Sequence, residues 1–234
     1  MRAFRLRPLK ELTDIIFPRH CVCCGQMLLG DERHLCTSCL MHLPYTCNAA
    51  VAGNDTEQHF QAYHDMVAAM SLLYFSHHED TRRIVHRIKY GGDRRLAVAM
   101  GRLMGETLVH SRRFADIDVL IPVPLHRRRE QQRGYNQSEM LCRGIALQTG
   151  RPVSTGNLVR TVNTASQTHM NIDERAANVH GVFTVRQPAK LAGLHILLVD
   201  DVITTGSTTS ACCDALYEAG NVTVSVASLA LTAT

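Results

Sequence analysis

Residues 195–209 read HILLVDDVITTGSTT, and this stretch decides the fold. Its continuous apolar run predicts a buried parallel strand, because such strands are covered on both faces. The run ends in Asp200 and Asp201, passes through a loop of glycine and hydroxylated residues, and continues as an apolar segment that predicts a helix at 211–218. Ligands of open α/β sheets bind at the carboxyl ends of such strands. We therefore expect the functional site at this point of the chain.

The loop after the two aspartates has the composition of a phosphate site. Gly206 permits a tight turn and close approach of the backbone to a ligand. The free N–H groups at the start of the following helix point at the same space, and this arrangement binds a phosphate monoester. The hydroxyl groups of the loop come from Thr204, Thr205, Ser207 and Thr208.

Asp200 and Asp201 face the opposite side of that ligand. Neighbouring carboxylates suit a diol or a hydrated magnesium ion, so a sugar phosphate with free hydroxyls satisfies both halves of the motif. The plainer interpretation is a strand followed by a capped helix, with the aspartates as ordinary loop acids.

The whole string DDVITTGST at 200–208 resembles the ribose-phosphate signature of the type I phosphoribosyltransferases. The resemblance implies that Asp200 and Asp201 contact the ribose hydroxyls. It also implies that the TTGST loop cradles the 5′-phosphate of phosphoribosyl pyrophosphate.

Strands that alternate with helices predict an α/β fold with a parallel sheet covered on both faces. We expect helices at 79–89, 96–109 and 138–148 in addition to 211–218. We expect the strands of this sheet at 68–75, 119–122, 182–185, 194–199 and 222–231.

A constrained turn follows the apolar strand that ends at Pro122. Prolines cannot continue a ladder, so Val123 and Pro124 carry the chain over the same edge of the sheet. Several arginines follow, the last of them Arg133, and planar guanidinium groups match the oxygens of pyrophosphate. We expect this turn and Arg133 to bind the substrate. The alternative is a solvated basic loop.

Two cysteine pairs near the N-terminus predict a structural zinc site. The motifs Cys21-x-x-Cys24 and Cys36-x-x-Cys39 can supply four thiolates in tetrahedral geometry. So short a segment cannot bury a sizeable core, which makes a metal necessary. A redox dithiol is the other interpretation. Other residues could serve as zinc ligands in place of these four. Cys23 could replace Cys24, and the less favoured substitutes are Cys47, His20 and His34.

We predict two domains, with the boundary near residue 65. Residues 1–65 would hold an amphipathic helix, the zinc-ribbon-like module and a polar linker at 48–65, and residues 66–234 would form the larger domain. No apolar run approaches the ~20 residues of a membrane span. The odd number of cysteines, nine, makes a poor disulfide framework, so we expect a cytoplasmic protein.

Two further stretches extend the resemblance over nearly the whole chain. IKYGGDRRLA at 88–97 and IPVPLHRRREQQRGYNQS at 121–138 resemble the ComF family of phosphoribosyltransferase-like proteins. The resemblance implies a four-cysteine zinc knuckle, a phosphoribosyltransferase-like domain and a link to natural DNA uptake in bacteria. Residues 159–183 are similar to a connection that forms a flap over the active site in related enzymes.

Two functions stay open. The first is a transferase that binds phosphoribosyl pyrophosphate with magnesium and lets an acceptor displace pyrophosphate. The second is a non-catalytic accessory protein that binds single-stranded DNA, works with DNA-uptake proteins or senses a nucleotide. Residues 82–133 hold thirteen Lys and Arg against five Asp and Glu, a net charge of +8 where the whole chain has only +4. This asymmetry suits a phosphate backbone, although few aromatic residues accompany it.

Overall fold

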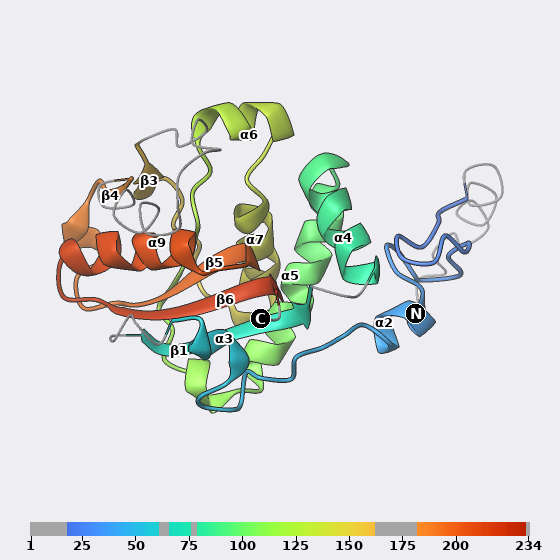
Figure 1. The fold of residues 1–234 in the computed structure, drawn as a ribbon, viewed down its shortest axis with the longest axis horizontal. Coiled ribbons are helices and arrows are strands. Elements are labelled where there is room, and N and C mark those ends of the chain that lie inside the picture. Colours follow the sequence, from blue (N-terminus) through green and yellow to red (C-terminus); the bar gives the residue numbers. More distant parts are fainter. Residues whose placement is uncertain (1–17, 61–65, 76–78, 162–181, 233–234) are drawn as a thin grey trace, which may run out of the picture.

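The computed structural model describes residues 18–60, 66–75, 79–161 and 182–232. Its centre is a four-stranded sheet in the order β1-β6-β5-β2, and every neighbouring pair is parallel (Figure 1). The predicted α/β class, a parallel sheet covered by helices behind a cysteine module, is confirmed. The strands of this sheet are β1 (Met66–Tyr74), β2 (Val119–Pro122), β5 (His195–Ile203) and β6 (Thr223–Leu231).

Helices cover both faces of the sheet because its strands carry apolar side chains on both sides. On β5, Leu197 and Val199 belong to one apolar cluster, whereas Ile196 and Leu198 belong to the other. The first cluster is completed by α4 (Glu79–Tyr90), α5 (Arg94–Val109) and α7 (Gln137–Thr149). The second is completed by α9 (Ser207–Glu218).

Glycines allow α5 and α7 to approach very closely. A Cβ atom on Gly144 would lie 2.2 Å from the carbonyl oxygen of Val98, and one on Gly101 would lie 2.2 Å from that of Leu141. Both obstacles are backbone atoms, which cannot turn aside as a flexible side chain can. The two helices therefore form one tightly packed layer on the sheet face that carries Leu197 and Val199.

The short strand predicted at 182–185 does not belong to the main sheet, and this prediction was wrong. β4 (Phe183–Val185) pairs antiparallel with β3 (Leu158–Arg160) in a separate two-stranded sheet. Each of these strands has only three residues, so the sequence pattern is too short to indicate which strand it pairs with. The segment that joins β3 to β4, and with it most of the predicted flap, lies outside the described residues.

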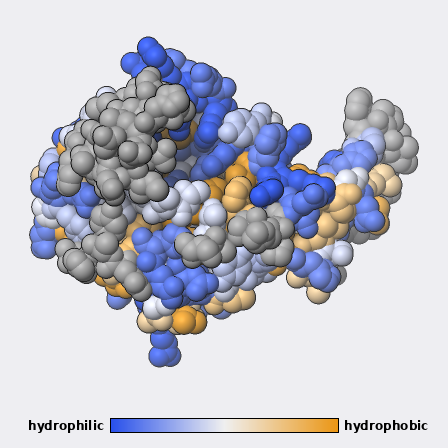
Figure 2. Space-filling view, in the orientation of Figure 1, coloured by the Kyte–Doolittle hydropathy of each residue, from blue (hydrophilic) through white to orange (hydrophobic). Residues whose placement is uncertain are grey.

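The basic segment after the proline turn forms a helix, where the plainer interpretation expected a loop. α6 (Arg127–Arg133) begins at His126, whose ring Nδ1 accepts a hydrogen bond from the backbone of Arg128 at 3.2 Å. It ends at Gly134, which has the positive φ of +76° that glycine tolerates. Its four arginines contribute to the hydrophilic surface at the top of the molecule (Figure 2).

The polar segment that we expected to be a surface linker instead packs along β1. Asn48 Oδ1 accepts a hydrogen bond from the backbone of Ser71, and Glu57 Oε1 accepts one from the backbone of Ala69. Because β1 is an edge strand, these side chains satisfy N–H groups that no neighbouring strand reaches. Residues 48–60 therefore cover the sheet edge, with α3 (Asp55–Gln58) as a single turn of helix.

The cysteine module, residues 18–43, lies at one end of the molecule beside α4 (Figure 1). It contains α2 (Thr37–Met41) and contacts α4 through Arg83, which donates a hydrogen bond to the carbonyl of Cys23. The predicted amphipathic helix at the N-terminus lies outside the described residues, and the domain boundary near residue 65 stays a prediction. Within the part described, no helix combines the length and the apolar character needed to cross a membrane.

Candidate functional site

The two aspartates lie within the last residues of β5, which runs on to Ile203. Asp200 is buried, with 9% of its surface exposed. Its carboxylate accepts hydrogen bonds from the backbone of Asp201 at 2.7 Å, from Thr209 Oγ1 at 3.3 Å and from Ser138 Oγ at 3.4 Å. β5, α9 and α7 thus fix the orientation of this carboxyl group.

Asp201 points to the opposite side of the strand and holds a cation. Its Oδ1 lies 3.0 Å from the ammonium nitrogen of Lys89, at the C-terminal end of α4. Burial and the negative charge of Asp201 raise the pKa of Asp200 to about 7, while its hydrogen bonds and Lys89 act in the opposite direction. One carboxyl group is therefore easily protonated and its neighbour is ion-paired.

The predicted phosphate loop follows directly and leaves its hydroxyl groups accessible. Thr204, Thr205, Ser207 and Thr208 are exposed, and the hydroxyls of Thr205 and Ser207 lie 2.8 Å apart. Gly206 has a φ of +76° and serves as the N-cap of α9, with no side chain capping the helix. The N–H of Ser207 donates to Thr205 Oγ1 at 3.5 Å. Those of Thr208 and Thr209 have no acceptor among the described residues and can bind an anion.

Phe60 closes the back of this loop, a contact that sequence reasoning missed. A Cβ atom on Gly206 would lie 3.1 Å from Phe60 Cε1, and Phe60 is almost fully buried. Phe60 lies in a polar segment, so the sequence pattern did not indicate this contact. The one feature that could have indicated it is a single aromatic residue among polar neighbours. Glycine is therefore favoured at position 206 for two reasons. Its backbone has a positive φ, and Phe60 leaves little room for a side chain.

The proline turn lies beside β5, just before the aspartates. The backbone N–H of Val123 donates to the carbonyl of Val199 at 2.9 Å, and Asn136 Nδ2 donates to the carbonyl of Val123 at 3.0 Å. The side chain of Val123 is buried in the core, and Pro122 is also buried. Of the three predicted turn residues, only Pro124 is partly exposed at this edge.

A cationic cavity of about 490 Å³ adjoins the aspartate pair. Arg133 lines it, with its guanidinium 5.5 Å from the ring centroid of Tyr90 and 2.9 Å from Gln137 Oε1. Lys89 lines the same cavity and also contacts Asp201, so it joins the two parts of the site. Sequence reasoning did not single out Lys89, although it lies in the IKYGGDRRLA stretch. The lining consists of Lys89, Tyr90, Gly92, Arg129, Gln132 and Arg133.

The four predicted zinc ligands come together in the cysteine module. The Sγ atoms of Cys21, Cys24, Cys36 and Cys39 all lie within 4.8 Å of one another. A tetrahedral site with Zn–S bonds of about 2.3 Å separates sulfur atoms by about 3.8 Å, and the Sγ atoms of Cys24 and Cys36 are 3.8 Å apart. Although burial opposes it, backbone hydrogen bonds lower the pKa of Cys21 to about 7, which favours the thiolate.

The alternative ligands lie outside this cluster. Cys23 is buried against α4, with its Sγ 4.0 Å from the carbonyl oxygen of Asp80, and burial raises its pKa to about 12. Cys47 is exposed beyond α2 and is absent from the cluster among the described residues. The donor set and spacing fit a zinc ion on the four predicted sulfurs.

Comparison with known proteins places this architecture in a family. No protein-family model matches the chain. The DNA utilization protein YhgH of Escherichia coli O157:H7 is 30% identical over 214 residues, which cover 88% of this chain and 87% of that protein. Competence protein ComFC of Bacillus subtilis is 26% identical over 202 residues, 86% of this chain and 78% of that protein.

The chain belongs to the ComF family. The resemblance to this family drawn from its sequence motifs is thereby confirmed. YhgH of Salmonella typhi is 34% identical over 146 residues, and this alignment spans 63% of that ComF relative's length.

Two solved structures resemble the ComF sheet more distantly. A glutamine phosphoribosylpyrophosphate amidotransferase from B. subtilis has a TM-score of 0.41 and 18% identity over 61% of this chain and 30% of that chain. The allosteric regulatory enzyme of purine biosynthesis has a TM-score of 0.39 and 22% identity over 56% of this chain and 26% of that chain. At these scores the two structures add nothing to the fold assignment.

Proposed function

We propose that this chain binds phosphoribosyl pyrophosphate with magnesium at the carboxyl edge of its sheet and acts in natural DNA uptake. The observation that carries the ligand proposal is the position of Lys89. Its ammonium group lies 3.0 Å from Asp201 and also lines a cavity with Arg129 and Arg133. A carboxylate pair, an open helix N-terminus and a cationic cavity are thus contiguous.

Each part of the ligand has a partner of matching chemistry. The 5′-phosphate accepts hydrogen bonds from the N–H groups and hydroxyls of residues 204–208. The ribose hydroxyls donate to Asp200 and Asp201. The pyrophosphate lies in the cationic cavity, where Arg129 and Arg133 present guanidinium groups.

The donor set also fits magnesium, which prefers carboxylate oxygens and retained waters. Asp200 and Asp201 would hold the ion, and the ion pair between Lys89 and Asp201 supports a cation at this point. When bound, magnesium neutralises part of the charge on the pyrophosphate group. Lys89, which lines the cavity, would donate to the pyrophosphate oxygens.

The side chains of the site favour transfer at the anomeric carbon. Positive charge develops on the ribose ring as its bond to pyrophosphate breaks, and the carboxylate of Asp201 stabilises that charge. The guanidinium groups of Arg129 and Arg133 receive the leaving pyrophosphate. Positioning and electrostatics would then supply most of the catalysis.

The link to DNA uptake rests on the relatives, which include a DNA utilization protein and a competence protein. A second candidate, single-stranded DNA binding without catalysis, is favoured by the exposed arginines of α6. Of the four α6 arginines, only Arg129 and Arg133 line the cavity of the sugar-phosphate site. The other two would remain accessible to DNA.

Calorimetric titration with phosphoribosyl pyrophosphate and magnesium tests the ligand proposal. We expect saturable binding that Gly206→Val abolishes, because a side chain there meets Phe60 and the positive φ of +76° disfavours valine, so the loop must shift. Thr205→Val removes only a hydroxyl and should weaken binding without disturbing the fold. Asp116→Asn, exposed and outside the site, is the matched control. Equal affinity in all four proteins would exclude the proposed phosphate loop.

A further inference from the structure

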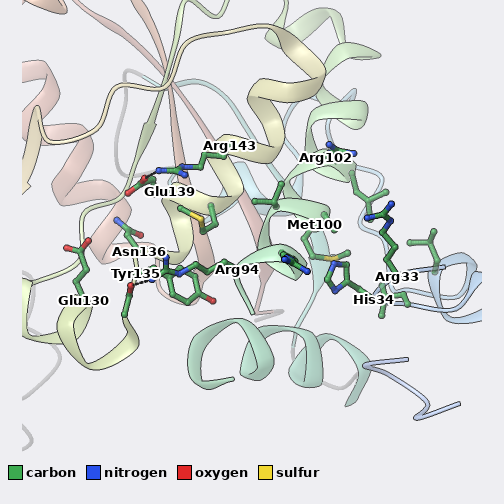
Figure 3. Close-up of a pocket in the computed structure, with 18 residues that line it drawn as sticks. Arg33, His34, Arg94, Met100, Arg102, Glu130, Tyr135, Asn136, Glu139 and Arg143 are labelled. Carbon is green, nitrogen blue, oxygen red and sulfur yellow. Dashed lines mark hydrogen bonds and ion pairs between the residues drawn. The ribbon is translucent and has the colours of Figure 1, made fainter. Parts of the chain in front are cut away.

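A second and larger cavity, of about 910 Å³, lies along the outer side of α5 (Figure 3). The cysteine module borders it at one end through Arg33 and His34, and the turn between α6 and α7 borders it at the other through Tyr135. It shares no lining residue with the cavity beside Asp201 or with the phosphate loop. The sugar-phosphate site therefore does not account for it.

The floor of this α5 groove is aliphatic. Leu35, Met100 and Met140 are buried at its base, and Val98 and Leu103 are half-buried above them. Surfaces of this kind bind apolar side chains, because the removal of apolar surface from water is favourable.

The rim of the groove is cationic. Arg33, Arg95 and Arg102 are exposed, and none of them forms a hydrogen bond or ion pair with the described residues. Further along, Arg94 and Arg143 are already engaged, with Gly134 and Glu139 respectively. Three available guanidinium groups thus border one apolar floor.

The exposed face of α5 has the geometry of a helix-packing surface. Its lining residues recur at spacings of three and four, namely Arg95, Val98, Ala99, Arg102 and Leu103. This stripe is one continuous face of a helix, and the small Ala99 allows a second helix to approach closely. Arg95 and Arg102 of this stripe are exposed, and Val98, Ala99 and Leu103 are half-exposed between them.

We propose that the α5 groove binds an acidic amphipathic helix of a partner protein. Apolar side chains at i, i+3, i+4 and i+7 fill the aliphatic floor, and carboxylates beside them pair with Arg33, Arg95 and Arg102. Such a helix would contact both the apolar floor and the cationic rim, whereas a simple anion would contact only the rim.

Two other occupants fit less well. Single-stranded nucleic acid requires aromatic platforms, and the one aromatic residue of the groove, Tyr135, is 5% exposed with Arg94 over its ring at 5.1 Å. The chain's own first 17 residues contain four basic side chains against two acidic ones, the same sign as the rim.

The test begins with a peptide-display library of random segments of about four helical turns, roughly 14 residues, panned on the immobilised full chain. The enriched peptide is then synthesised, labelled and titrated by fluorescence anisotropy. The groove variant carries Arg33→Glu, Arg95→Glu and Arg102→Glu. The control carries Arg112→Glu, Arg186→Glu and Lys190→Glu, three exposed cations outside the groove with the same change in net charge.

We expect enriched peptides with acidic residues beside an apolar i, i+3, i+4, i+7 stripe. Their affinity should fall about tenfold or more in the groove variant and change little in the control. Peptides without acidic residues, no enrichment, or affinity that survives in the groove variant would overturn the proposal. A labelled thymidine oligonucleotide of about 20 nucleotides is titrated in parallel. If it loses binding only in the groove variant, the groove is a nucleic-acid site and the proposal is wrong.

Discussion

At the scale of single residues, Asp200 is a buried carboxyl group with a strongly raised pKa. It is buried beside a second carboxylate, and both conditions favour its protonated form and raise its pKa to about 7. A folded-state pKa above the unfolded value means that the folded protein binds the proton more tightly. The free energy of unfolding is therefore highest below the unfolded pKa, near 4, and falls as the pH rises through 7.

Asp200→Asn should remove this pH dependence. The amide keeps an acceptor for Thr209 and Ser138 but cannot ionise, so the variant should become more stable than the parent as the pH rises from 5 to 8. Each unit of pKa difference corresponds to about 1.4 kcal/mol, so we expect a gain of the order of 1–4 kcal/mol at pH 8. Urea unfolding at several pH values measures it. Parallel stability curves for both proteins would contradict the assignment.

The residues found from sequence and those missed differ in how they reach the site. Asp200, Asp201 and the 204–208 loop are consecutive, so the motif itself brings them together. Lys89 arrives from the end of α4 and Phe60 from a segment along the opposite sheet edge. Contacts of this kind depend on tertiary packing, which periodicity and spacing do not encode.

At the scale of helices and strands, the glycine contact between α5 and α7 sets the rigidity of the site. Gly144→Ala should destabilise the protein by about 1–3 kcal/mol or more through overpacking, although helix propensity alone favours alanine by about 1 kcal/mol. The sign of the change therefore separates the two effects. Leu147→Ala, at a 60% exposed position of α7, is the control. Denaturant unfolding that finds Gly144→Ala more stable would disprove the close approach.

The cysteine module should depend on zinc. Structural zinc contributes about 10–16 kcal/mol of apparent binding free energy, so Cys24→Ser or Cys39→Ser should lose the metal and unfold residues 18–43 while the main sheet persists. Cys47→Ser lies outside the cluster and should retain one zinc per chain. Metal content and circular dichroism measure both effects. Fresh parent protein with well under one zinc per chain would reject the site.

Sequence patterns predicted some elements well and others poorly. Long elements with strong periodicity, such as α5 and β6, were predicted within a few residues. The β3–β4 pair was misassigned, because a three-residue strand carries too little pattern to reveal its partner. Residues 48–60 were misread since their polar side chains bond to a sheet edge and not to water.

At the scale of the whole molecule, cations concentrate between α4 and α6. If the exposed arginines of α6 form a nucleic-acid track, single-stranded DNA should bind with a salt slope of about −0.7 per phosphate neutralised. Arg127→Glu with Arg128→Glu should then make the slope shallower by about 1–2 units. Anisotropy titrations between about 50 and 200 mM salt measure it, with Arg112→Glu and Arg186→Glu as the control. Unchanged slopes, or no binding at low salt, would exclude the track.

The central claim is that the paired aspartates and the 204–208 loop form one magnesium-dependent sugar-phosphate site. The most direct measurement is the affinity for phosphoribosyl pyrophosphate, by calorimetry, across a series of magnesium concentrations in the parent, Asp201→Asn and Asp116→Asn. We predict that magnesium strengthens binding in the parent and in Asp116→Asn but has little effect in Asp201→Asn. Binding that strengthens equally in all three proteins, or no binding in the parent, would contradict the account.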